Sequence, residues 1–169
     1  MAKIIGWLRD KAPGFDQLSD DELEAISDFS LLWSLFEARI LNFSGSARAI
    51  CRAVDDWRAS GVFDAEVLNE ELAGFRQHYF ANGDFTHHFD HLHLRDNDFE
   101  QVVRAVIDGT DNDPRDRVVA ILIIVFRFRN NLFHGVKWQY NLAGQKANFA
   151  IANATLVKVL ERYGALADG

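Results

Sequence analysis

The chain has 169 residues, of which 49% are hydrophobic and 25% are charged. Such a composition can build a core, which excludes a disordered chain, and the length fits one domain. The single cysteine excludes a disulfide framework and a thiolate zinc cage. The longest apolar run, 118–126, is much shorter than the roughly 20 residues of a membrane span. The sequence therefore predicts a soluble, cytoplasmic protein.

Charge is distributed unevenly along the chain. Residues 1–116 contain 11 Lys and Arg against 23 Asp and Glu, whereas residues 117–169 contain 7 against 2. The net charge of −7 argues against non-specific binding to duplex nucleic acid, which needs broad neutralisation of phosphates. The basic final third permits a small anion-binding site. Acidic surface helices that keep the protein in solution explain the same pattern.

Capping signals and apolar spacing predict the first helices. Residues 1–18 are expected to form a short leader, and residues 19–169 one helical domain. Ser19 and Glu22 form a capping box before a long helix whose apolar stripe runs from Phe29 to Phe43. Three more helices are expected: one over 47–59 that Gly61 stops, one from 64 that stops at Asn82-Gly83, and one from 99 that ends at Gly109.

Asp113 and Pro114 mark the clearest helix start in the chain, with Asp at the N-cap and Pro in the first turn. The following segment, 118–128, is rich in β-branched residues and is also compatible with a buried strand. The Asp-Pro start and a length of about 20 residues favour a buried helix over 114–134. A last helix is expected over 143–163. The fold class predicted is all-α, an antiparallel bundle of five or six helices.

Polar side chains crowd the end of the helix predicted over 114–134. They are Arg127, Arg129, Asn130, Asn131 and His134. Burying guanidinium groups without partners is costly, so we expect this end to meet solvent or a cleft. Asn130 and His134 are four residues apart and share a helix face, while Arg127 and Asn131 lie on nearly the same face.

These side chains suit the cleavage of phosphodiester bonds. His134 can move protons near neutral pH, Arg129 can hold the phosphate, and Asn130 can orient the imidazole. In RNA the 2′-hydroxyl is a built-in nucleophile, so no metal or other cofactor is needed. One histidine supplies one of the two proton-transfer groups, and a symmetric dimer would supply the second. In a purely structural interpretation, which stays open, the arginines pair with acids of neighbouring helices and His134 caps its helix.

At these residues the sequence resembles the HEPN family of small α-helical proteins, many of them RNases of toxin–antitoxin and phage-defence systems. The family signature is an arginine, four to six residues and a histidine, often with a polar residue after the arginine. Arg129 fits with four intervening residues and is followed by Asn130, while Arg127 fits with six. We favour Arg129 because the Arg-Asn start is the commoner form.

The resemblance implies a helical bundle and a homodimer in which two motifs face one cleft. It also implies metal-independent RNA cleavage that leaves a cyclic phosphate and, for a toxin, a cognate antitoxin protein. We assign Arg129, Asn130 and His134 to catalysis, and Arg127, Asn131 and Lys137 to substrate contacts. Because the family also contains inactive members, the alternative is a non-catalytic module that binds a nucleotide or a protein.

Three further features have more than one interpretation. Glu37 either pairs with an arginine of the motif or is a carboxylate at the boundary of the core. Trp138 and Tyr140 either stack on unpaired bases or close the end of the bundle. Five of the six histidines lie between 78 and 93, and His87 and His91 are spaced i, i+4. Their spacing matches no strong zinc signature, so they are solvated, or line an RNA groove, and no metal is assigned.

Overall fold

A computed structural model of the chain describes residues 2–135 and 144–166. Its α-helices are α1 (Ala2–Lys11), α2 (Asp20–Arg39), α3 (Ala47–Ala59), α4 (Asn69–Tyr79), α5 (His87–Asp90), α6 (Glu100–Asp108), α7 (Pro114–Phe133) and α9 (Lys146–Tyr163). Single 3₁₀ turns are η1 (Phe15–Gln17), η2 (Glu66–Leu68) and η3 (Asp96–Asp98), and the strands β1 (Phe80–Ala81) and β2 (Asp84–Phe85) form one small hairpin. The all-α prediction is confirmed.

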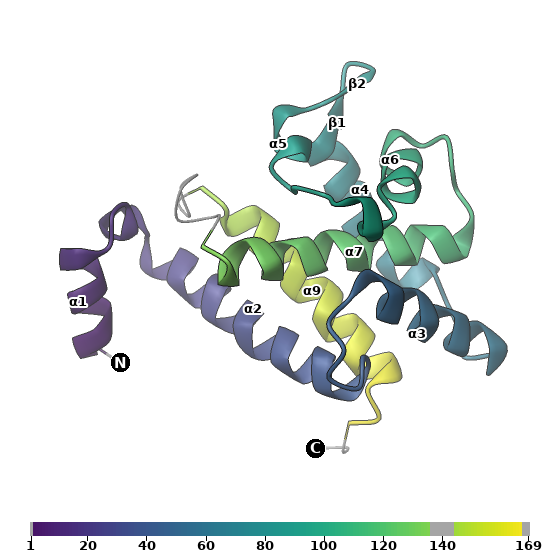
Figure 1. The fold of residues 1–169 in the computed structure, drawn as a ribbon, viewed down its shortest axis with the longest axis horizontal. Coiled ribbons are helices and arrows are strands. Elements are labelled where there is room, and N and C mark those ends of the chain that lie inside the picture. Colours follow the sequence, from purple (N-terminus) through teal and green to yellow (C-terminus); the bar gives the residue numbers. More distant parts are fainter. Residues whose placement is uncertain (1, 136–143, 167–169) are drawn as a thin grey trace.

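Helix α7 runs through the middle of the molecule, with α2 on one side and α4 to α6 on the other, and α9 crosses it (Figure 1). It is buried from Val118 to Leu132 except at Arg129. The segment is a helix rather than a strand because its start is capped: the Asp113 side chain accepts hydrogen bonds from the backbone N–H groups of the first turn. Neither α7 nor any other described helix is both long and apolar enough to cross a membrane.

Helices α2 and α9 form the most extensive helix pair, and they run in the same direction. Near the start of both helices, Lys146 Nζ lies 2.6 Å from Asp21 Oδ2. Further along both, Asn153 Nδ2 donates to the carbonyl of Ala25 at 3.0 Å. The predicted antiparallel arrangement is therefore wrong for this pair, because the chain crosses the molecule through α7 before α9 begins.

Two local predictions are corrected. The apolar stripe of α2 was expected to reach Phe43, but the helix ends at Arg39 and Phe43 lies outside it, exposed and with a positive φ. Asn82-Gly83 was interpreted as a helix stop, yet it forms the turn of the β1–β2 hairpin. Both residues have positive φ, as a tight hairpin turn requires.

The segment expected as a leader is folded. It forms α1 and then η1, and the two are joined through Gly14 with φ 78°. Phe15 and Leu18 are buried in the same core as α2 and α9, so the connection is anchored. Helix α1 itself stands apart from the other helices (Figure 1).

Candidate functional site

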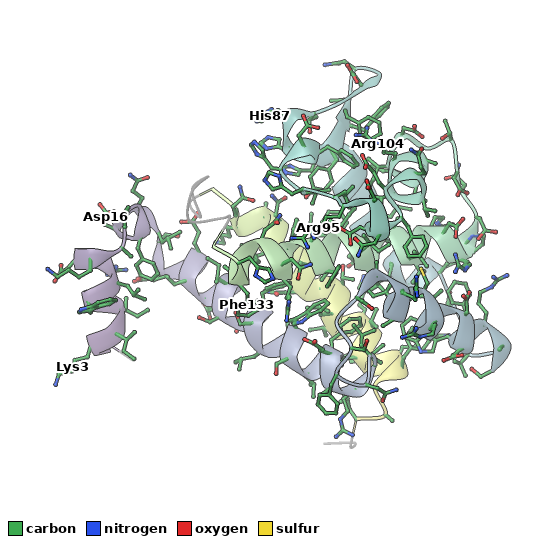
Figure 2. The ribbon with its side chains drawn as sticks, viewed as in Figure 1. Lys3, Asp16, His87, Arg95, Arg104 and Phe133 are labelled. Carbon is green, nitrogen blue, oxygen red and sulfur yellow. The ribbon has the colours of Figure 1, made fainter. Side chains whose placement is uncertain are left out.

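The fold separates the polar side chains at the end of α7 into buried and accessible groups. Arg127, Asn130 and Asn131 are buried, with 2%, 8% and 1% of their surface exposed. Arg129 is partly exposed. His134 is exposed at the C-cap of the helix, where its backbone N–H donates to the backbone carbonyl of Asn130 at 3.0 Å. The labelled Phe133 marks this end of the helix in Figure 2.

Arg127 belongs to a buried ion pair. Its Nη1 lies 3.3 Å from Asp98 Oδ2, and its Nε donates to the carbonyl of Leu92 at 3.0 Å. Asp98 also accepts a hydrogen bond from the backbone N–H of Arg95, at the start of η3. Burial lowers the pKa of the Arg127 guanidinium, and the negative charge of Asp98 opposes that shift. The pair fastens the segment before α6 to α7.

Asn131 completes this attachment. Its Nδ2 donates to the carbonyls of His91 and Leu92, at 3.0 and 3.2 Å, and its Oδ1 accepts from Arg127 Nη2 at 3.4 Å. Arg127 and Asn131 were expected to contact a substrate. Because both are enclosed and hydrogen-bonded within the fold, we assign them a structural role instead.

Arg129 points to a different neighbour. Its Nη1 donates to Asn130 Oδ1 at 3.0 Å, and its Nη2 lies 3.9 Å from Glu37 Oε2. The guanidinium carbon lies 5.6 Å from the ring centroid of the exposed Phe133. Within the described residues, Arg129 Nε is buried without a hydrogen-bond partner. The Asn130 side chain therefore holds the guanidinium of Arg129, whereas the sequence predicts that it orients the imidazole of His134.

Glu37 links the site to α2. Its Oε2 accepts a hydrogen bond from Trp33 Nε1 at 2.8 Å and faces Arg129. The opposite oxygen is close to the chain that follows α2: a Cβ atom added at Gly45 would lie 2.6 Å from Glu37 Oε1. Glu37 therefore pairs with Arg129, an arginine of the motif, which is the first of the two interpretations of this residue. The sequence signal for its role is the i, i+4 spacing to Trp33.

Glu37→Ala is expected to lower the free energy of unfolding by about 1–3 kcal/mol, because the indole N–H of the buried Trp33 loses its acceptor. Urea unfolding followed by circular dichroism measures the change. Glu24→Ala, an exposed glutamate of the same helix, is the control and is expected to stay within about 0.5 kcal/mol of the wild type. Equal losses in the two variants would contradict this role of Glu37.

One group of predicted residues is not described by the structure, and one residue at the site was not predicted. Lys137, Trp138 and Tyr140 lie outside the described residues. Phe133, which is not among the predicted site residues, has an exposed ring that contacts the guanidinium of Arg129. Its signal was its position four residues after Arg129, on the same helix face.

Four of the histidines gather beside α5. The rings of His78 and His88 stack at 4.4 Å between centroids, and His87 and His91 lie beside them. The cluster borders a small pocket whose other lining residues include Phe128 of α7. In the described part of the chain, no group of three or more His, Cys, Asp or Glu side chains is placed to hold a metal ion.

Comparison of the chain with protein-family models, with curated proteins and with solved structures finds no match. The resemblance to HEPN proteins therefore depends on the pattern at 129–134 and stays a prediction.

Proposed function

We propose that this protein is a metal-independent endoribonuclease in which His134 transfers protons and Arg129 binds the phosphate. The supporting observation is the division of polar side chains at the end of α7. Arg129 is partly exposed and His134 is exposed, whereas Arg127 is buried with its own counter-ion. Arg129, the more exposed of the two arginines, is separated from His134 by four residues. This is the spacing that we favour from the resemblance.

In the proposed reaction, the ribose 2′-oxygen attacks the adjacent phosphorus and the bond from phosphorus to the 5′-oxygen breaks. A base takes the 2′-hydroxyl proton and an acid protonates the leaving 5′-oxygen, so the products are a 2′,3′-cyclic phosphate and a 5′-hydroxyl. Arg129 stabilises the additional negative charge on the phosphate as the bond forms. Asn130 and Glu37 hold the guanidinium in place from two sides.

The reaction needs two proton-transfer groups, an acid and a base, and His134 supplies only one of them. We propose that a second copy of the chain supplies the other imidazole, in a homodimer with two motifs at one cleft. Such an enzyme would act in the cytoplasm as a toxin or defence effector and would require an antitoxin protein to restrain it.

A non-catalytic module is the second candidate. The observation that favours it is the partial neutralisation of Arg129 by Glu37, which weakens the attraction of the guanidinium for phosphate. A module of this kind would bind a nucleotide or a partner protein at the same end of α7 without cleaving RNA.

The test compares the wild type with His134→Ala on single-stranded RNA in the presence of EDTA. His87→Ala, which removes an exposed histidine of α5, is the matched control. The wild type and His87→Ala are expected to yield products with cyclic phosphate ends, and His134→Ala is not. Equal cleavage by all three proteins would contradict the proposal, as would activity that EDTA removes and zinc restores. RNA that is bound but not cut would favour the module.

A further inference from the structure

Helix α1 presents an apolar face that no described part of the fold covers. Ile4 and Trp7, three residues apart on one side of the helix, expose 68% and 61% of their surface. The adjoining strip of the helix surface is anchored, because Ile5 and Leu8 pack against the core. With Phe15 buried in the connection, α1 is held away from the other helices (Figure 1).

Helix α2 carries a second apolar patch. Leu31 exposes 72% of its surface and Leu35 exposes 38%. The two are four residues apart and lie on the side of α2 that faces away from its buried residues Phe29, Trp33 and Phe36. Single exposed apolar residues need no explanation, but two such pairs at helical spacing are typical of interaction sites.

The two faces differ in net charge. Exposed Lys3 and Lys11 flank the apolar pair of α1, and Lys3 is labelled in Figure 2. Exposed Glu24 and Asp28 precede the pair of α2 and, at spacings of three and four residues, lie on the same side of the helix as Leu31. Asp10 is also exposed beside Trp7, and Arg39 is exposed beside Leu35, so the face of α1 is basic by one charge and the face of α2 is acidic by one charge. A basic apolar helix and an acidic apolar face on one chain are complementary to each other.

We propose that α1 of one copy packs on the Glu24–Leu35 face of α2 of a second copy, and that the contact is made reciprocally. Ile4 and Trp7 would then meet Leu31 and Leu35, with the lysines beside the acids. A reciprocal contact of this kind closes a symmetric dimer. A buried tryptophan alone removes roughly 150–250 Å² from water. This contact rests on the homodimer of the proposed function and names the surfaces that join it. A dimer that both charge-reversed variants retain would overturn this contact alone and leave the proposed function standing, whereas a monomer would overturn both.

A second copy of the chain accounts for both exposed apolar faces, whereas a membrane surface would account only for that of α1. A short basic helix with an exposed tryptophan also suits the surface of an anionic membrane. That occupant would leave the acidic Leu31 and Leu35 face without a partner. The net charge of −7 would also oppose binding to anionic lipid.

The decisive experiment uses two charge-reversed variants and analytical ultracentrifugation. One carries Lys3→Glu and Lys11→Glu, and the other carries Glu24→Lys and Asp28→Lys. The wild type is expected to be a dimer, and each variant alone is expected to associate at least tenfold more weakly, because like charges then face each other. An equal mixture of the two is expected to regain the dimer, since both contacts of a mixed pair again join opposite charges.

Trp7→Ala tests the apolar part of the contact. It is expected to weaken the dimer at least tenfold, whereas Phe43→Ala, which removes an exposed ring beyond α2, leaves it unchanged. Circular dichroism checks that every variant is folded. A monomeric wild type would overturn the proposal, and so would variants that fail to regain the dimer on mixing. A monomer that binds anionic vesicles through Trp7 would overturn it in favour of a membrane.

Discussion

Asp98→Ala is expected to lower the free energy of unfolding by about 3–5 kcal/mol, the largest loss of stability among the changes considered. Asp98 and Arg127 are both buried, and their charged groups lie 3.3 Å apart. Removing the carboxylate leaves a guanidinium in the interior without its counter-ion. Urea or thermal unfolding followed by circular dichroism measures the loss.

Asp96→Ala, at an exposed position of the same 3₁₀ turn, is the control and is expected to change stability by no more than about 0.5 kcal/mol. The double variant Asp98→Leu with Arg127→Met is expected to recover most of the loss, because no charge then remains buried. A double variant less stable than Asp98→Ala would show that the ion pair itself, rather than an uncompensated charge, determines the stability here.

Arg129→Ala is expected to slow RNA cleavage by about 10²–10³-fold, the effect of removing one group that stabilises the transition state. Arg129→Lys keeps the positive charge but cannot form two parallel hydrogen bonds to a phosphate, so an intermediate rate is expected. Single-turnover cleavage of a labelled single-stranded RNA measures both rates.

Arg39→Ala removes an exposed arginine at the end of α2 and is the matched control, with cleavage expected at the wild-type rate. RNA binding is measured separately for each variant. Cleavage by Arg129→Ala at the wild-type rate would contradict the role of Arg129. A loss confined to RNA binding would favour the non-catalytic module.

The helices of this protein could be predicted because their signals are local. Ser19 with Glu22 and Asp113 with Pro114 satisfy backbone groups within the first turn of their own helices, whatever the rest of the fold does. The predicted helix over 47–59 and the start at Pro114 agree with the structure. The hairpin at Asn82-Gly83 was missed because the same dipeptide ends helices and turns strands.

The roles of the charged residues on α7 could not be predicted in the same way. Arg127 and Arg129 are two residues apart, which places them about 200° apart around the helix. One therefore faces Asp98 before α6 and the other faces Glu37 on α2. The sequence could place both arginines at the end of a helix, but it could not say which element lies on each side of it.

The amino-acid sequence by itself determined the all-α class, the helix starts and the crowding of polar groups at the end of α7, since propensity, capping and periodicity act over a few residues. Only the tertiary structure decided which of those groups are accessible, that α2 and α9 run in the same direction, and that residues 2–18 are folded. Each of these depends on contacts between segments far apart in the chain, and no local pattern encodes such contacts.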